Sequence, residues 1–119
     1  MELANQFDPI PADDGPRLLV RNPEYRVIAM VVQLDAVCGL ENVRVVHVND
    51  SKAPLGSRKD RHEHIGAGEI GRDGFRCLLA DPLFRDVPGY LETEKGDDPE
   101  SGEPWDVINL RTLRELAPN

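Results

Sequence analysis

The chain has 119 residues, which is enough for one domain and too few for two. Its formal net charge of −8 excludes a protein that coats nucleic acid with positive charge, because phosphate binding depends on Lys and Arg. No apolar run approaches the roughly 18 residues of a membrane span, and no basic and apolar leader opens the chain, so we expect a cytoplasmic protein that makes no membrane contact.

Residues 1–22 are predicted to form an extended or disordered arm, because several prolines and an Asp-Asp-Gly run interrupt any hydrophobic period. Residues 23–38 are predicted to form a helix with apolar residues at helical spacing. Asn22 can cap this helix, Pro23 suits its first position, and Gly39 fits the position just past its end.

Strands and helices are then predicted to alternate. The valine-rich stretch "NVRVVHVND", residues 42–50, is typical of a buried strand, and a long polar loop follows it. A helix is predicted at residues 72–81, a second short strand at 89–94 and a last helix at 105–116. This order predicts an α/β fold with two parallel strands and about three helices. Because two strands cannot close a sheet, we expect open strand edges.

All histidines of the chain, His47, His62 and His64, lie in one short window. His47 is placed at the end of the first strand and Glu92 at a similar place on the second, where parallel α/β folds collect catalytic groups. Asp60 and His62 are two residues apart, so in an extended segment both can reach one cation. Carboxylate with imidazole suits zinc. A histidine in a strand is also commonly a core residue, and a charged loop is commonly solvated, so both interpretations stay open here.

The stretch "GLENVRVVHVNDSKAPLGSRKDRHEHIGAGEIG", residues 39–71, resembles the signature region of the endonuclease IV family. These are zinc-dependent apurinic/apyrimidinic endonucleases built on a TIM barrel. The resemblance continues through residues 74–95 and more weakly back to Pro23. It implies that residues 23–119 are the C-terminal part of such a barrel, an incomplete barrel with its last two βα units. Residues 1–22 match nothing in the family.

The resemblance also implies a metal site. His47 and Glu92 correspond to residues that help hold one zinc ion in the family, and Asp60 and His62 to ligands of another. His64 belongs to the same motif, but we do not carry it over as a ligand. The family binds three zinc ions, and at most one or two are expected here.

Three basic residues of the loop, Lys52, Arg58 and Arg61, are expected from the resemblance to face DNA phosphate or to brace the loop. Plain solvation is the alternative. The DNA partner that the resemblance implies is a strand with an abasic site.

The activity implied by the resemblance is zinc-assisted hydrolysis of the phosphodiester bond 5′ to an abasic site, a step in DNA repair. The ligands that the family draws from earlier strands have no counterpart in this sequence, so we expect little or no incision by the chain alone. Three interpretations stay open. The chain is a truncated family member, a fragment that completes a barrel with another chain, or a small zinc-binding or interaction domain without catalysis.

Overall fold

The computed structural model describes residues 23–54 and 56–118, and the predicted arm at residues 1–22 lies outside this part of the chain. Helix α2 (Pro23–Cys38) has the bounds that the sequence predicts, and a short 3₁₀ helix η1 (Leu40–Asn42) follows it. Gly39 makes the turn between them with a φ of +79°. This positive φ favours glycine, because L side chains rarely adopt it.

Strands β1 (Val46–His47) and β4 (Gly89–Tyr90) form a parallel pair. The N–H of Val48 donates to the carbonyl oxygen of Tyr90 at 2.7 Å and continues the ladder by one bond. The parallel arrangement of the two predicted strands is therefore confirmed.

Both strands are shorter than the predicted segments 42–50 and 89–94. The reason lies just beyond their ends, where the side chain of Asn49 replaces a backbone partner. Its Oδ1 accepts the N–H of Glu92 at 2.7 Å. The two chains stay side by side here, but the regular ladder ends.

A second, antiparallel pair lies within the segment that the sequence analysis treats as a loop. It joins β2 (Asp50–Ser51) to β3 (His62–Glu63). The N–H of Lys52 donates to the carbonyl oxygen of Arg61 at 2.9 Å and extends this pair. Each strand has two residues, too few to show an alternating pattern in the sequence, which explains why the pair was not predicted.

Helices α3 (Gly71–Ala80) and α5 (Trp105–Leu116) correspond to the predicted helices at residues 72–81 and 105–116. A further short helix, α4 (Leu83–Asp86), was not predicted. It begins directly after Pro82, which suits the start of a helix although it ends the one before.

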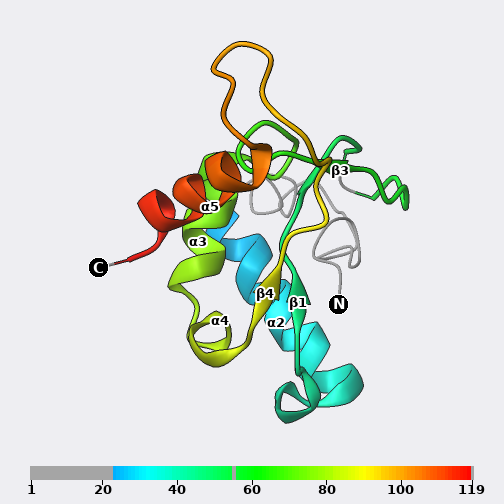
Figure 1. The fold of residues 1–119 in the computed structure, drawn as a ribbon. Coiled ribbons are helices and arrows are strands. Elements are labelled where there is room, and N and C mark those ends of the chain that lie inside the picture. The colour runs from blue at the N-terminus through cyan, green and yellow to red at the C-terminus, as the bar shows by residue number, and fades with distance from the viewer. Residues whose placement is uncertain (1–22, 55, 119) are drawn as a thin grey trace.

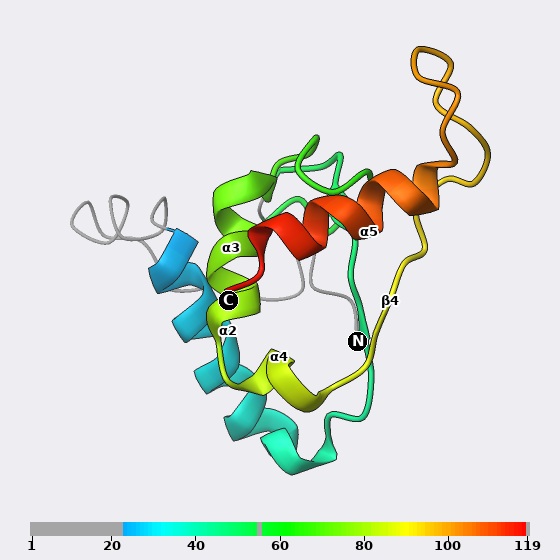
Figure 2. The ribbon, with the colours of Figure 1, turned by 60° about the vertical axis from the view of Figure 1, so that its left-hand side comes forward.

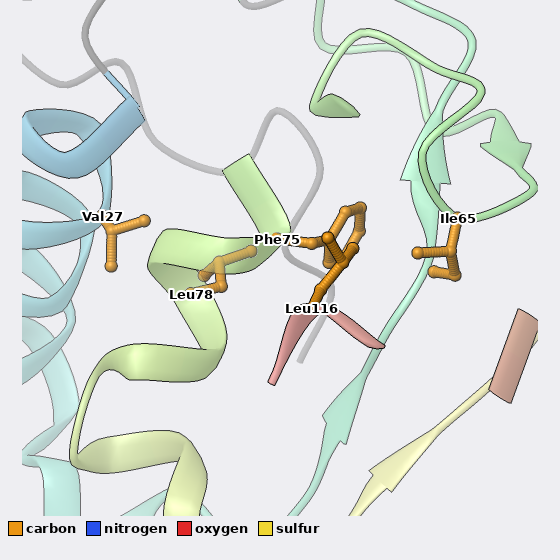
Figure 3. Close-up of a cluster of buried hydrophobic side chains, with 5 residues drawn as sticks. All are labelled: Val27, Ile65, Phe75, Leu78 and Leu116. Atoms are coloured by element: carbon orange, nitrogen blue, oxygen red, sulfur yellow. The ribbon is translucent and has the colours of Figure 1, made fainter. Parts of the chain in front are cut away.

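The core lies between α2, α3 and α5 (Figure 3). Phe75 of α3 is fully buried at its centre. Four other buried side chains complete the cluster: Val27, Ile65, Leu78 and Leu116. Ile65 comes from the segment after β3, so the histidine-rich segment is anchored in the same core as the helices.

Helices α2, α3 and α4 lie to one side of the β1–β4 pair, α5 crosses above the upper ends of the two strands, and the loop between β4 and α5 extends away from the body (Figure 2). The carboxyl ends of β1 and β4 point to the same end of the molecule, where β3 and the start of α5 also lie (Figure 1). Among the described residues, β1 pairs with β4 alone, so the barrel is open. The fold is thus a partial α/β barrel, as predicted.

Candidate metal centre

His47 and Glu92 meet at the carboxyl ends of the parallel strands. His47 is the last residue of β1, and Glu92 follows β4 by two residues. The Nδ1 atom of His47 lies 3.1 Å from Oε1 of Glu92. The structure thus brings together two of the predicted ligands that are far apart in the sequence.

The other predicted ligands, Asp60 and His62, form a second pair beside the first. Oδ1 of Asp60 lies 3.0 Å from Nε2 of His62. The other ring nitrogen of His62, Nδ1, lies 3.1 Å from the backbone carbonyl oxygen of Glu92. Glu92 therefore joins the two pairs, through its carboxylate to His47 and through its carbonyl to His62.

The carbonyl of Glu92 also fixes the tautomer of His62. A carbonyl oxygen only accepts hydrogen bonds, so Nδ1 of His62 carries the hydrogen and donates it. This leaves Nε2, which is shielded from solvent, facing the carboxylate of Asp60. Two electron-rich atoms this close need a proton or a cation between them. Metal-binding histidines commonly donate their other ring N–H to a carbonyl in this way.

The separations in both pairs suit zinc. Tetrahedral zinc holds nitrogen and oxygen at about 2.0–2.1 Å, which puts two ligands about 3.3 Å apart. The observed 3.1 Å and 3.0 Å are slightly shorter, so small side-chain rotations would place both donors of either pair on one ion. The same separations suit ion pairs of protonated histidines. No group of three or more His, Cys, Asp or Glu side chains in residues 23–54 and 56–118 could hold a metal. Each pair therefore fits half of a tetrahedral shell.

Asp50 fixes the course of the chain behind this centre. Its side chain is fully buried, and its carboxylate accepts hydrogen bonds from five backbone N–H groups at 2.8–3.2 Å. The five donors are Ser51, Gly66, Gly68, Ile70 and Gly71. A side chain at Gly68 would collide with this carboxylate, because its Cβ would lie 2.6 Å from Oδ1 of Asp50. The role of Asp50 was not predicted. Its one signal in the sequence is a carboxylate directly after a buried strand and ahead of a glycine-rich turn.

His64 contacts two residues of α5. Its ring stacks on that of Trp105 with 3.9 Å between the ring centres and 16° between the planes. Its Nδ1 lies 3.0 Å from Nδ2 of Asn109, so this nitrogen is engaged with α5. The expectation that His64 is not a ligand agrees with this placement and stays a prediction.

The three basic residues that were predicted to face phosphate are exposed. Lys52 and Arg61 flank the β2–β3 pair, where their backbones are hydrogen bonded. Arg58 lies between them in the sequence and has a φ of +57°, a backbone conformation that residues other than glycine adopt infrequently. Their position leaves all three able to reach a large partner, and the phosphate contact stays a prediction.

None of the described helices is long and apolar enough to span a membrane.

The comparison with protein families gives a match to a family described as xylose isomerase-like TIM barrel, over residues 20–116. The chain belongs to this family.

Within this family the chain is similar to endonuclease IV. Proteins named probable endonuclease 4 from Aquifex aeolicus (strain VF5) and Persephonella marina are 49% and 50% identical to it over 73% and 71% of its length. The crystal structure of endonuclease IV from Thermus thermophilus matches 80% of the chain with a TM-score of 0.65 and 39% identity. The predicted resemblance is thus confirmed. The chain spans 29% and 27% of the two relatives and 33% of the Thermus protein.

Proposed function

We propose that this chain supplies part of the zinc centre of a DNA-repair endonuclease that cleaves the phosphodiester bond 5′ to an abasic site. The observation that supports this most is the meeting of the two imidazole–carboxylate pairs at the carboxyl ends of β1 and β4. The four side chains come from three separate segments, and they gather where barrel enzymes carry their catalytic groups. The relatives named endonuclease IV and endonuclease 4 support the same activity.

In this proposal His47 and Glu92 hold one zinc ion, and Asp60 and His62 hold another. Zinc held by these residues would supply a hydroxide at neutral pH and would stabilise the charge on the leaving oxygen. The chain itself fixes the donor atoms. The carbonyl of Glu92 orients His62 so that its Nε2 faces Asp60, and Asn49 holds the backbone of Glu92 in place.

The exposed side chains of Lys52, Arg58 and Arg61 contact phosphates on either side of the abasic site in this proposal. Such contacts position a duplex without reading its sequence, which suits an enzyme that recognises a missing base. The local basic patch matters more for this than the net charge of −8, because the charge at the site decides the local potential.

The chain alone is expected to incise little or no DNA. Three histidines occur in the whole sequence, and His64 is engaged with α5. The two pairs supply four ligands, which is half of what two tetrahedral zinc ions need. The three zinc ions of the family need more. The other ligands have to come from outside residues 23–119.

A fragment that completes a barrel with another polypeptide is the second candidate. The open edges of the β1–β4 pair favour it, since each strand is paired on one side among the described residues. If the second polypeptide also supplies the missing ligands, the completed barrel would have the endonuclease activity proposed first.

An incision assay on a duplex with a single abasic site tests both candidates. The chain is assayed alone and mixed with the part of the Aquifex aeolicus relative that the chain does not match. We expect no cleavage by the chain alone, and chelator-sensitive cleavage by the mixture. Glu92→Gln in this chain should abolish the cleavage, whereas Glu94→Gln, at an exposed carboxylate two residues on, should not. Cleavage by the chain alone would contradict the need for outside ligands, and an inactive mixture would contradict complementation.

A further inference from the structure

Asn109 is a polar residue of α5 that is 1% exposed. Its Oδ1 accepts the backbone N–H of Ile65 at 2.9 Å. Its Nδ2 lies 3.1 Å from Oγ1 of Thr93 and 3.0 Å from Nδ1 of His64. A buried amide is costly unless it is hydrogen bonded, and here one side chain joins three residues from two other segments.

The identity of each atom in this network follows from the backbone. The N–H of Ile65 only donates, so the Asn109 atom that faces it is the oxygen and the other is the nitrogen. The nitrogen donates to Nδ1 of His64, which therefore accepts and carries no hydrogen. His64 is thus held as the tautomer with its hydrogen on Nε2.

The two segments that Asn109 joins are those that carry the metal-binding side chains. His64 and Ile65 follow His62 by two and three residues, and Thr93 is the neighbour of Glu92. We infer that Asn109 is a positioning residue for the metal centre, an inference that rests on the function proposed above. It sets the separation of the His62 and Glu92 segments from behind, without touching a metal ion itself.

Trp105 reinforces the same connection. It lies four residues before Asn109 on α5, so both side chains are on one face of the helix. Its ring stacks on that of His64 while Asn109 holds the edge of the same imidazole. The first turns of α5 therefore clamp the segment just after His62.

Cobalt binding distinguishes positioning from a general contribution to stability. Cobalt(II) is used in place of zinc because its visible absorption reports on the geometry of its ligands. Asn109→Leu fills the same space without hydrogen bonds, and Thr93→Val removes the link to the Glu92 segment alone. Thr112→Val is the matched control, because it removes a half-buried hydrogen bond of α5 to the carbonyl of Ile108, away from the centre.

We expect Asn109→Leu to bind cobalt about ten-fold or more weakly with an altered visible spectrum, as is usual when a residue behind a metal ligand is lost. Thr93→Val should weaken cobalt binding and alter the visible spectrum in the same direction, but to a smaller extent. It serves as the test if Asn109→Leu does not fold. Thr112→Val should bind as the unaltered chain does. Equal affinities and spectra in all folded variants would overturn the inference.

A second measurement needs no metal. In the metal-free chain, the ¹⁵N signals of the imidazoles report the tautomer and surroundings of His62 and His64. We expect Asn109→Leu to move the signals of both rings and Thr112→Val to move neither. Failure of the unaltered chain to bind cobalt would contradict the proposed function alone, and the imidazole signals would still decide the role of Asn109. A His62 signal unchanged in Asn109→Leu would then overturn it.

Discussion

His47 and Glu92 meet because two parallel strands end side by side, whereas Asp60 and His62 lie at the start of the two-residue strand β3, which leads into a turn held by one buried carboxylate. The first pair is held by backbone geometry, which few single substitutions disturb. The second pair depends on a short strand and on Asp50, whose carboxylate accepts five backbone N–H groups from the strand that pairs with β3 and from the turn that follows β3. We therefore expect the position of the His47–Glu92 pair to tolerate most single substitutions, and the position of the Asp60–His62 pair to depend on Asp50.

Asp50→Asn is expected to have the largest effect, on the half of the centre that depends on Asp50. The new amide keeps one oxygen, but its NH₂ group faces backbone N–H groups that have lost their acceptor. We expect the free energy of unfolding to fall by about 3 kcal/mol, since buried groups without partners cost about 1–3 kcal/mol each. Urea denaturation measures the loss. Asp35→Asn, at an exposed carboxylate that accepts one backbone N–H, is the control and should cost less than about 0.5 kcal/mol. Similar losses in both variants would contradict the role given to Asp50.

Gly68→Ala should disturb the surroundings of Asp50 by adding a side chain where there is no room for one. The added Cβ would lie 2.6 Å from Oδ1 of Asp50 and closer still to the carbonyl oxygen of Ser51. We expect a loss of about 2 kcal/mol, because overpacking against rigid atoms costs about 1–3 kcal/mol. Gly102→Ala meets no atom within 4 Å but has a φ of +76°, so it should cost only about 1 kcal/mol of backbone strain. A smaller loss of stability in Gly68→Ala than in Gly102→Ala, measured by urea denaturation, would contradict the close contact of residue 68 with Asp50.

Asn49→Ala tests the half that is built on strands. It removes the acceptor of the Glu92 N–H, which should cost about 1–2 kcal/mol. Hydrogen exchange should accelerate at the amide of Glu92 and stay slow at those of Gly66 and Gly68, which Asp50 holds. Asn49→Asp keeps an acceptor oxygen and should leave exchange at Glu92 slow. Faster exchange at the glycines in Asn49→Ala would mean that the two halves are not separate.

The smallest effect is expected at a surface pair outside both halves, Glu103 and Arg111. Their side chains form two hydrogen bonds, at 2.9 and 3.1 Å. These bonds from Arg111 lower the pKa of the Glu103 carboxyl below its ordinary value. Because the pKa is lowered in the folded chain, the stabilisation is present above the ordinary pKa of glutamate and is lost as the pH falls through the lowered one.

Arg111→Gln should therefore slightly reduce stability at pH 7 and make no difference in acid below the lowered pKa. Urea denaturation of both chains across this range measures it. If the difference in stability between the two chains grew as the pH fell, the lowered pKa of Glu103 could not be its cause.

The elements that the sequence predicts well are those with a repeating pattern. The bounds of α2 and α5 follow from apolar spacing and from the prolines and glycine at their ends. The parallel pair follows from the alternation of strands and helices, and with it the closeness of His47 and Glu92. Local sequence rules suffice for these features because short-range geometry determines them.

The remaining features depend on contacts between distant residues. Nothing near Asp50 in the sequence shows that its carboxylate will bind the N–H of Gly71, 21 residues later. Asn109 likewise looks like an ordinary polar residue of an amphipathic helix, although it is buried against residues 44 and 45 positions earlier. The pairing of β2 with β3 belongs to the same class. The metal roles of the four ligands were predicted from resemblance, and they stay predictions.

The zinc content of the purified chain after size-exclusion chromatography shows whether the two imidazole–carboxylate pairs bind metal. Elemental analysis should find one or two zinc ions per chain. His47→Ala and Glu92→Gln should each lose the ion that the His47–Glu92 pair holds, whereas the control Glu94→Gln should lose none. Equal zinc content in all variants would exclude the His47–Glu92 pair as a zinc site. No zinc in the unaltered chain would contradict the claim that these two imidazole–carboxylate pairs form a working part of a metal centre.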